Sequence, residues 1–437
     1  MNWLYSTGRS TTAALGTAIL SVVRVAIMTA GSRGDVAPYT GLGHALSRAG
    51  HEVTLVTHSR FEPLVAGSDL GFHALPVDPR AELESSRGRG LHRSASGVGK
   101  LARVVEMARS LVGRMTDDLV TAARASDVLL LSASLAPLGH TIAEGLRLPS
   151  VGVYLQPRHA TREFAPPVLG TVSLGSFGNR LAAHGVDLAV ERVFAQAVPA
   201  VRARLGLPRS RRPGAARRAR ERQGWPVLHG FSPLVVPRPQ DWRAGLDVTG
   251  YWWPYDRETQ LPTHLRDFLD AGPAPVFVGL GSATVPDARR LSTDVVRALR
   301  RAGLRGVIQR GWAGLEASGD DILTIDEVPH SLLFPEMAAV VHHCGAGTTA
   351  AGLRAGVPAV PVPIQFDEGF WGARLVALGV APRAVPLRRL TADTLASALV
   401  RATRETGFQQ RAQALGARVR GEDGAGPVVD AVSAFQR

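Results

Sequence analysis

A histidine pair beside a glycine-rich turn is the clearest chemical feature of the sequence. His342 and His343 follow a short apolar run, and the turn Gly-Ala-Gly-Thr-Thr (residues 345–349) begins after one further residue. An apolar run that leads into such a turn is typical of a strand followed by a helix. The unpaired N–H groups and the positive dipole at the start of a helix attract anions. This segment therefore predicts an anion site, most naturally for phosphate, beside a histidine.

Two carboxylates stand in a comparable position one strand further on. Residues 359–362 are expected to form the next buried strand, and Asp367 and Glu368 follow it, just before a second helix. Ligands of open α/β sheets bind outside the carboxyl ends of the strands. The two acids could hold sugar hydroxyls there while the helix terminus holds phosphates. The alternatives are a tight turn without a ligand and a solvated helix N-terminus, where carboxylates are favoured in any case.

The elements that would position these residues alternate regularly along the chain. Short apolar runs such as residues 22–28, 150–154 and 276–280 are separated by helical patterns. The first run has the β-branched composition of a buried parallel strand. Alternation of this kind implies parallel sheets with helices on both faces. Because 437 residues exceed one ordinary core, we expect two Rossmann-like α/β domains.

Several local expectations follow from the same patterns. Residues 39–49 and 61–66 are expected to be helical, and residues 227–231 are expected to form the last strand of the first half. Residues 156–177 lose periodicity and gather Pro, Gly, Ser and Phe. A loop of this length in a compact domain is usually functional or mobile.

Two motifs resemble those of one enzyme family. HHCGAGTT (residues 342–349), followed by GVP and DEGFWG, resembles the donor-sugar signature HHGGAGTT and GDQPFW of the family-one, UDP-glycosyltransferase-like enzymes. GSRGDVAP (residues 31–38) resembles their N-terminal GTRGDVQP. The nearest groups are the bacterial natural-product and sterol glucosyltransferases. The chain departs from the usual wording at Cys344, Phe366, Glu368 and Gly369, and the change at Glu368 leaves the donor sugar open.

The resemblance implies the GT-B fold, in which two Rossmann-like domains face each other across an interdomain cleft. We expect an N-terminal extension at residues 1–21, an acceptor-binding domain at residues 22–240 and a nucleotide-sugar-binding domain at residues 241–437. A final helical stretch, residues 391–417, is expected to pack back across both domains. The family resemblance also places residues 107–115 and the loop 156–177 in the wall of the acceptor pocket.

The resemblance also implies the site residues. Asp35 and His343 are the candidate catalytic residues, and Ser32, Arg33 and Asp35 are the candidate acceptor-binding residues. Donor binding is assigned to Gly281, Ser282, Trp312, Val328, His343, Gly345, Ala346, Gly347, Thr348, Asp367 and Glu368. No resident cofactor or metal is expected, because the donor is a nucleotide-sugar cosubstrate linked to UDP or dTDP.

The chemistry expected at these residues needs no metal ion. The chain contains no Asp-x-Asp triplet, so His343 and the N–H groups of residues 346–348 would stabilise the leaving diphosphate. Asp35 would act as the general base for the acceptor hydroxyl, an effect worth about 10²–10⁴ in rate. Alternatively, Asp35 caps the helix that begins near Pro38, which would lower its pKa and weaken it as a base. Inversion is expected, because no enzyme nucleophile is visible.

The predicted function is inverting transfer of a hexose or deoxyhexose to a hydroxyl of a lipophilic acceptor, such as a polyketide or macrolide aglycone or a sterol-like molecule, in natural-product biosynthesis. A nucleotide-sugar epimerase or hydrolase and a non-catalytic activator of a partner transferase are the alternatives. The sequence leaves open the nucleobase, the acceptor and the oligomeric state.

The charge of the chain does not by itself indicate a partner. Of 50 basic residues only Lys100 is a lysine, and the formal net charge is +13. No recognition motif supports nucleic-acid binding. The arginine-rich run 209–222 is interpreted as an exposed loop, with contact to anionic lipid as the alternative. Cys344 is the only cysteine and residues 11–28 are too short an apolar segment to span a bilayer. We therefore expect a cytoplasmic protein, with peripheral membrane contact left open.

Overall fold

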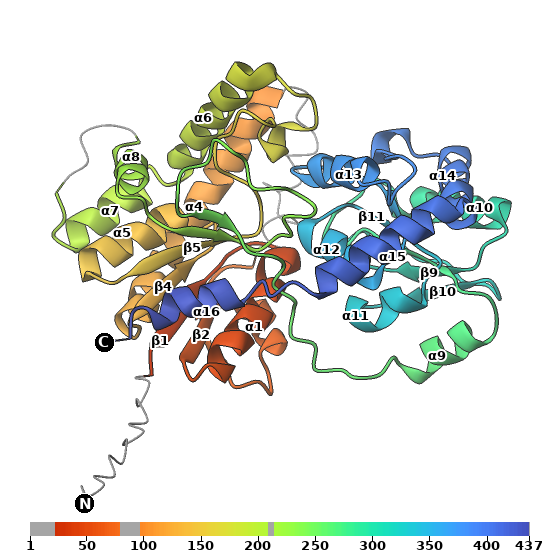
Figure 1. Cartoon of the computed structure of the whole chain (residues 1–437), viewed down its shortest axis with the longest axis horizontal. Helices are drawn as coiled ribbons and strands as arrows, with labels where there is room; N and C mark the ends of the chain where they lie inside the picture. Colours follow the sequence, from red (N-terminus) through yellow and green to blue (C-terminus); the bar gives the residue numbers. More distant parts are fainter. Residues whose placement is uncertain (1–21, 79–96, 209–213, 437) are drawn as a thin grey trace, which may run out of the picture.

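The computed structural model describes residues 22–78, 97–208 and 214–436, and of residues 97–108 it describes the backbone. Two α/β domains lie side by side (Figure 1), and each is built on one parallel sheet. The two Rossmann-like domains expected from the sequence are thereby confirmed. The predicted extension, residues 1–21, lies outside the described residues.

The N-terminal domain has seven strands in the order β3-β2-β1-β4-β5-β6-β7. β1 is central, and its Met28 pairs with Val56 of β2 and Leu131 of β4. Every residue of β4 is buried, as expected where helices cover both faces of a sheet. The strands are β1 Arg24–Met28, β2 Glu52–His58, β3 Gly71–Leu75, β4 Val128–Leu131, β5 Ser150–Tyr154, β6 Val227–His229 and β7 Leu246–Val248. The helices are α1 Arg33–Arg48, α4 Gly97–Arg124, α5 Ala136–Leu146, α6 Gly175–Val193, α7 Ala197–Arg204 and α8 Ala215–Arg222, with short 3-10 segments η1 Ser59–Leu64 and η2 Pro167–Leu169.

The C-terminal domain has five strands in the order β10-β9-β8-β11-β12. Its hydrophobic core joins α10 and α14 to one face of this sheet through side chains such as Leu299, Leu399 and Val341. The strands are β8 Val276–Gly279, β9 Gly306–Gln309, β10 Ile322–Ile325, β11 Ala339–His342 and β12 Ala359–Pro361. The helices are α9 Thr263–Asp270, α10 Ala288–Ala302, α11 His330–Leu333, α12 Ala346–Ala355, α13 Glu368–Ala377, α14 Ala392–Arg404 and α15 Thr406–Arg420, with η3 Phe334–Glu336 and η4 Leu387–Arg389. The last helix of the chain, α16 Gly426–Ser433, packs on the other domain.

Four elements differ from the sequence-based expectations. α1 begins at Arg33 rather than near residue 39, because Ser32 and Asp35 form a capping box ahead of Pro38. The helix expected near residues 61–66 is the 3-10 segment η1. α6 begins within the stretch that was expected to be a long loop. β7 pairs with β6, so the N-terminal sheet continues to Val248, beyond the boundary expected after residue 240.

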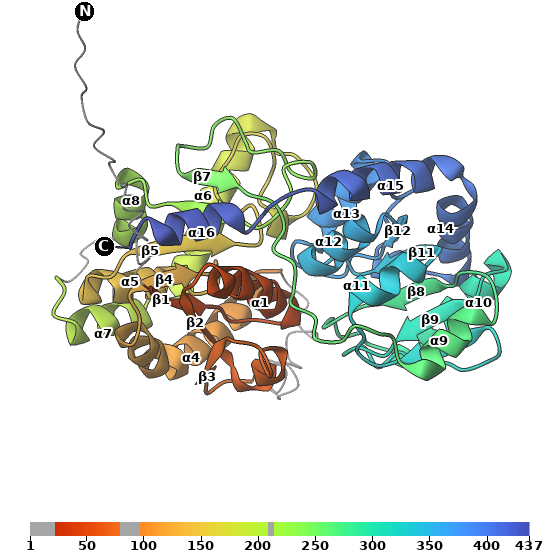
Figure 2. The same cartoon turned by 60° about the horizontal axis from the view of Figure 1, so that its bottom comes forward.

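The chain passes between the domains twice. It leaves the N-terminal domain after β7 and returns through α16, which lies against that domain at the end of the chain (Figure 2). Val428 and Val432 of α16 are fully buried in the same core cluster as Leu42 and Leu46 of α1. The helix that packs back is therefore α16, whereas α14 belongs to the core of the C-terminal domain.

Candidate active site

Helix α1, which follows β1, contacts helix α12, which follows β11, between the two domains. β1 leads through residues 29–32 into α1, and β11 leads through residues 343–345 into α12. The guanidinium of Arg33, the first residue of α1, lies 2.6 Å from the carboxylate of Glu327 in the segment after β10, with both side chains partly exposed. The fold thus brings the predicted acceptor loop and the predicted donor loops to one place.

The N-terminus of α12 is open. Its N-cap residue, Gly345, has no side chain to accept a hydrogen bond, so the N–H groups of Ala346, Gly347 and Thr348 lack both a capping group and an intrahelical acceptor. No atom lies within 4 Å of the place where a Cβ of Gly347 would stand. This helix end therefore has the exposed donors and the space that an anion needs.

His343 is held in place by two glycines. A Cβ on Gly281 would lie 2.7 Å from its Cε1, and a Cβ on Gly345 would lie 2.6 Å from its Nε2. Burial lowers the pKa of His343 to about 4, so the ring is neutral near pH 7. Its Nδ1 is buried without a hydrogen-bond partner among the described residues. Buried polar groups are usually paired, so this nitrogen is an exception to that rule.

Cys344 stands beside His343 in a backbone conformation that favours glycine. Its φ is +70°, in the left-handed region that costs a side chain about 1–2 kcal/mol. The thiol is fully buried, and the backbone N–H of Cys344 donates to Nδ1 of His342 at 3.1 Å. The departure from the usual glycine at this position is thus accommodated by packing and by one hydrogen bond.

Asp35 caps the first turn of α1. Its Oδ2 accepts hydrogen bonds from the N–H of Ser32 at 2.9 Å and from the Ser32 hydroxyl at 3.0 Å, which caps α1. Burial raises the pKa of Asp35, and the negative charge of Asp367 adds to this, whereas the hydrogen bonds from Ser32 and Gln156 lower it. The expectation that capping leaves Asp35 with a lowered pKa is wrong, because burial outweighs the capping hydrogen bonds. A raised pKa makes Asp35 a stronger base.

Asp367 and Glu368 have different surroundings. The indole Nε1 of Trp371 donates to Asp367 Oδ2 at 2.8 Å, which orients this carboxylate. Oε2 of Glu368 accepts from the backbone N–H groups of Ile364 and Gln365 at 2.6 and 2.7 Å, so Glu368 stabilises the turn after β12. Burial nevertheless raises the pKa of Glu368 to about 7.

The remaining predicted donor residues follow the other strands of the same sheet. Ser282 comes after β8, and Gly281 accepts a hydrogen bond from the backbone N–H of Trp312 at 3.0 Å. Val328 follows β10. The Arg60 guanidinium of the N-terminal domain lies 5.0 Å from the centre of the Trp312 ring. The structure therefore gathers the donor set along the carboxyl edge of the C-terminal sheet, next to the N-terminal domain.

Other residues at these loops were not found from the sequence. His58 at the end of β2 accepts from the backbone N–H of Gly31 at 3.1 Å, and burial lowers its pKa to about 4. A Cβ on Gly31 would lie 2.4 Å from Asp35 Oδ2, so glycine is needed there. The only signal for His58 is its position at the carboxyl end of the strand next to β1.

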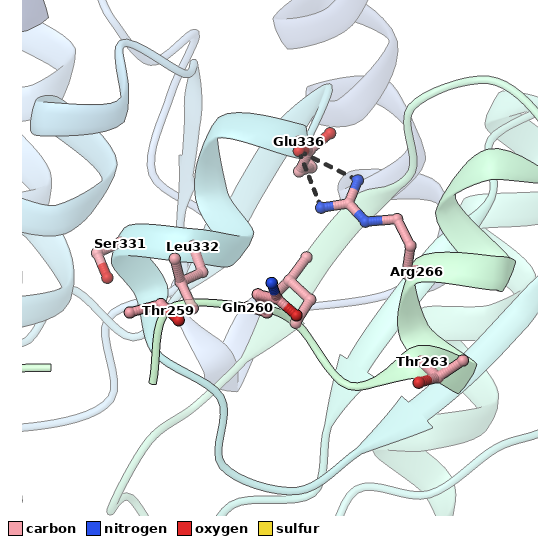
Figure 3. A pocket seen from close by; sticks show the side chains of 8 residues that line it. Thr259, Gln260, Thr263, Arg266, Ser331, Leu332 and Glu336 are labelled. Atoms are coloured by element: carbon pink, nitrogen blue, oxygen red, sulfur yellow. Dashed lines mark hydrogen bonds and ion pairs between the residues drawn. The ribbon is translucent and has the colours of Figure 1, made fainter. Parts of the chain in front are cut away.

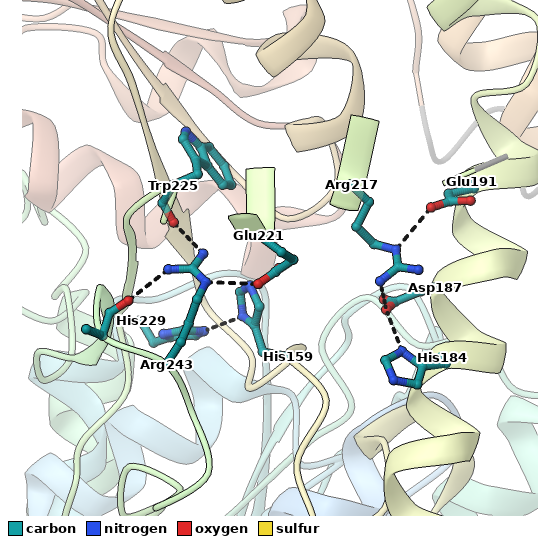
Figure 4. Close-up of polar contacts among 10 residues, drawn as sticks. His159, His184, Asp187, Glu191, Arg217, Glu221, Trp225, His229 and Arg243 are labelled. Carbon is teal, nitrogen blue, oxygen red and sulfur yellow. Dashed lines mark hydrogen bonds and ion pairs between the residues drawn. The ribbon is translucent and has the colours of Figure 1, made fainter. Parts of the chain in front are cut away.

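The loop over residues 156–177 is anchored rather than free. His159 Nδ1 and His229 Nε2 are 3.3 Å apart (Figure 4), and the Thr161 hydroxyl donates to the Asp241 carboxylate at 2.6 Å. Burial lowers the pKa of His159 to about 3, so this contact joins two neutral rings. The segment expected to wall the acceptor pocket is thus fixed to the sheet.

The arginines of α8 are engaged within the protein. Arg217 lies 3.1 Å from Glu191 and 3.4 Å from Asp187 (Figure 4). The Arg220 guanidinium lies 5.9 Å from the centre of the Trp225 ring. The part of the arginine-rich run that the structure describes is therefore helical and paired with other side chains, whereas residues 209–213 lie outside the described chain.

A separate hollow of about 440 Å³ lies between α9 and α11. It is lined by residues such as Thr259, Thr263 and Ser331, and an ion pair between Arg266 and Glu336 borders it (Figure 3). None of the predicted site residues lines it. This hollow is distinct from the loops described above.

Comparisons with known proteins agree with the two-domain architecture. A glycosyltransferase family 28 N-terminal domain matches residues 25–165, and an erythromycin biosynthesis protein CIII-like C-terminal domain matches residues 308–434. The structure of the glycotransferase of kitacinnamycin superposes with a TM-score of 0.67 at 19% identity, covering 95% of this chain and 100% of that one. Glycosyltransferase VinC, in complex with dTDP, superposes with a TM-score of 0.65 at 21% identity, covering 94% and 99%. The fold is that of the GT-B glycosyltransferases.

The relatives that are similar in sequence include sterol glucosyltransferases. Sterol 3-beta-glucosyltransferase UGT80A2 of Arabidopsis thaliana is 32% identical over 94% of this chain and 65% of its own length. A sterol 3-beta-glucosyltransferase of Cryptococcus neoformans is 30% identical over 94% of this chain and 27% of its own length. The chain thus spans less than two thirds of these relatives. Over nearly its whole length, the chain is therefore similar in sequence to these glycosyltransferases.

Proposed function

We propose that this protein transfers a hexose or deoxyhexose from a UDP- or dTDP-sugar to a hydroxyl of a lipophilic acceptor. The observation that carries the proposal is the open N-terminus of α12 beside His343. Both lie close to the loop of Asp35, whose pKa is raised. An anion site on one domain and a general base on the other suit the transfer of a sugar, because the sugar can lie between them while its bond to the diphosphate breaks and its bond to the acceptor forms.

In this reaction, the acceptor oxygen attacks the anomeric carbon while the bond from that carbon to the diphosphate oxygen breaks. The acceptor proton passes to Asp35, and the Ser32 hydroxyl and N–H hold that carboxylate in position. The leaving diphosphate takes the electron pair of the broken bond and is stabilised by the N–H groups of residues 346–348. A single displacement of this kind inverts the anomeric centre.

His343 contributes as a neutral hydrogen-bonding group rather than as a fixed cation. With a pKa of about 4, the free ring carries no charge near pH 7, and an anion bound beside it would raise that pKa. Asp367 is oriented by Trp371 and is placed to accept hydrogen bonds from sugar hydroxyls. His343 and the N–H groups of residues 346–348 supply the stabilisation that other sugar transferases obtain from a divalent metal.

A sterol-like alcohol is the favoured acceptor, because the sequence relatives are sterol 3-beta-glucosyltransferases. The structural neighbours named above fall below 25% identity and support the fold alone. Polyketide and macrolide aglycones, and with them a place in natural-product biosynthesis, are therefore the second acceptor class to be screened.

The test incubates the purified full chain with UDP-glucose or dTDP-glucose, a sterol or a macrolide aglycone in detergent micelles, and a metal chelator. Mass spectrometry of the products is expected to detect one glycosylated acceptor, with turnover unchanged by the chelator. His343→Ala is expected to abolish donor binding in calorimetry. Arg266→Gln, in the separate hollow, serves as the matched control. Nucleotide release without a glycosylated acceptor, or restoration of turnover by magnesium, would contradict the proposal.

A further inference from the structure

Exposed apolar side chains are concentrated on one stretch of the N-terminal domain. Of the nine large hydrophobic residues exposed in the described chain, seven lie between residues 168 and 188. On α6 these are Phe177, Leu181 and Leu188; the preceding segment adds Val168, Leu169, Val172 and Leu174. We call these seven side chains the α6 surface. Scattered exposed apolar residues need no explanation, whereas a contiguous group marks an interaction site.

The α6 surface follows one face of a regular helix. Phe177, Leu181, His184 and Leu188 are spaced by four, three and four residues, which places them on a single stripe. Phe177 is 82% exposed, whereas Ala183 on another face of α6 is buried. In Figure 1, α6 forms the outer edge of its domain. The helix therefore has one face for its own domain and a second apolar face that its fold does not use.

The segment before α6 is fixed to this helix. The buried Asn179 side chain accepts a hydrogen bond from the backbone N–H of Leu174 at 2.8 Å. Its amide nitrogen donates to the Arg162 carbonyl at 3.1 Å and to the Ser173 hydroxyl at 3.2 Å. These bonds hold the end of the segment, at Ser173 and Leu174, against the first turns of α6.

Positive charge borders the apolar side chains. Arg162 and Arg180 line a hollow of about 420 Å³ together with Phe177, Leu181 and His184. Neither guanidinium has an ion-pair partner within the described part of the chain. Two nearby acids have partners: Asp187 faces Arg217 at 3.4 Å and His184 of the stripe at 3.9 Å, and the Glu163 carboxylate accepts from the backbone N–H of Gln240 at 2.7 Å.

We propose that the α6 surface docks on a bilayer that contains anionic phospholipid. Phe177 and Leu181 would enter the boundary between head groups and acyl chains, while Arg162 and Arg180 would bind lipid phosphates. An apolar stripe bordered by arginines is the arrangement by which helices lie in a membrane interface, and anionic lipid attracts basic residues within a Debye length of the surface. None of the described helices combines the length and apolarity needed to cross a membrane.

The α6 surface extends to the candidate active site. Thr171, within the segment of this surface, lies with its Cγ2 3.8 Å from the place where a Cβ of Gly369 on α13 would stand. Phe366, which precedes α13, is 63% exposed. A docked protein would therefore hold its donor-sugar loop near the bilayer, where a lipophilic acceptor resides. Docking goes beyond the proposed function, and its test requires neither donor nor acceptor.

The test mixes the full chain with vesicles of phosphatidylcholine alone, or of phosphatidylcholine with about one third phosphatidylglycerol, and separates bound protein by flotation. We expect binding to the anionic vesicles that weakens as salt is added. The double variant Arg162→Gln with Arg180→Gln is expected to lose roughly thirtyfold in affinity, since each surface arginine contributes about fivefold. Arg289→Gln with Arg297→Gln, on exposed positions of α10, makes the same charge change elsewhere and is expected to bind normally.

The apolar contribution is tested by Phe177→Ser with Leu181→Ser. Both side chains are exposed, so thermal unfolding is expected to match that of the wild type while vesicle binding is lost. Equal binding to neutral and anionic vesicles, unchanged binding by this variant, or no binding to either vesicle would overturn the proposal. A dimer in light scattering that Phe177→Ser converts to a monomer would also overturn it, because a second copy would then cover the α6 surface.

Discussion

Replacing Glu368 by glutamine is expected to change the pH dependence of stability. The carboxyl has a pKa of about 7 in the folded protein, against 4.5 for an ordinary glutamate, because burial disfavours its charged form. The folded state therefore binds this proton more tightly than the unfolded chain does. The stability contributed by Glu368 is complete below pH 4.5 and is lost as the pH rises through 7.

The size of the effect follows from the shift in pKa. At about 1.4 kcal/mol per pKa unit, a rise from 4.5 to about 7 corresponds to about 3 kcal/mol of stability lost by the wild type above pH 7. In Glu368→Gln, the side-chain carbonyl oxygen still accepts from the N–H groups of Ile364 and Gln365. The variant therefore keeps the turn but has no carboxyl group to ionise in the folded state, so its free energy of unfolding at alkaline pH is expected to exceed that of the wild type.

The assay is urea unfolding of both proteins, followed by tryptophan fluorescence, at several values between about pH 5 and about pH 8.5. Other titrating groups cancel in the difference between the two proteins, which is expected to grow in favour of Glu368→Gln as the pH rises. The turnover of the wild type is expected to change near pH 7, and this inflection is expected to be absent in the variant. A stability difference that stays constant over this range would refute the reasoning.

Three further predictions concern other parts of the site. Asp35→Asn is expected to lower kcat by about 10²–10⁴ while α1 stays folded, because asparagine also caps helices; a kcat near that of the wild type, measured with saturating substrates, would remove Asp35 as the base. Gly281→Ala is expected to weaken nucleotide binding in calorimetry at least tenfold, since its Cβ would lie 2.7 Å from His343 Cε1 at a φ of +55°. Gly314→Ala controls for backbone strain, because Gly314 has a similar φ of +68° but space for a Cβ. A double-mutant cycle with Arg33→Gln and Glu327→Gln is expected to give a coupling below about 1 kcal/mol in donor binding, because the pair is partly exposed; a coupling of several kcal/mol would mean that the bridge holds the domains together.

The strands could be predicted from the sequence because buried parallel strands are continuous apolar runs. β5 begins and ends where the pattern placed it, and β8 begins at the expected residue and ends one residue earlier than expected. β7 was missed, because only Leu246 of its three residues is buried. α6 was missed for a related reason: several of its apolar residues face away from the core, so no inward stripe marks it.

The site could be predicted in its residue types but not in its energetics. The turn after β11 and the loop after β1 carry recognisable glycines, and the topology brings them together. The raised pKa of Asp35 depends on how deeply the fold buries it, which no local pattern records. Contacts such as His58 with Gly31, or Arg33 with Glu327, join residues that are distant in sequence and arise only from the packing of whole elements.

The two passages of the chain between the domains touch each other, and this has a mechanical consequence. The Trp252 indole N–H donates to the carbonyl oxygen of Gly424 at 2.8 Å, and a Cβ on Gly424 would lie 2.4 Å from the Tyr251 carbonyl oxygen. The two connections therefore lie against each other where they cross between the domains, and a change that loosens one of them also removes a contact of the other. Trp252→Phe removes this hydrogen bond while it keeps an aromatic ring at that place.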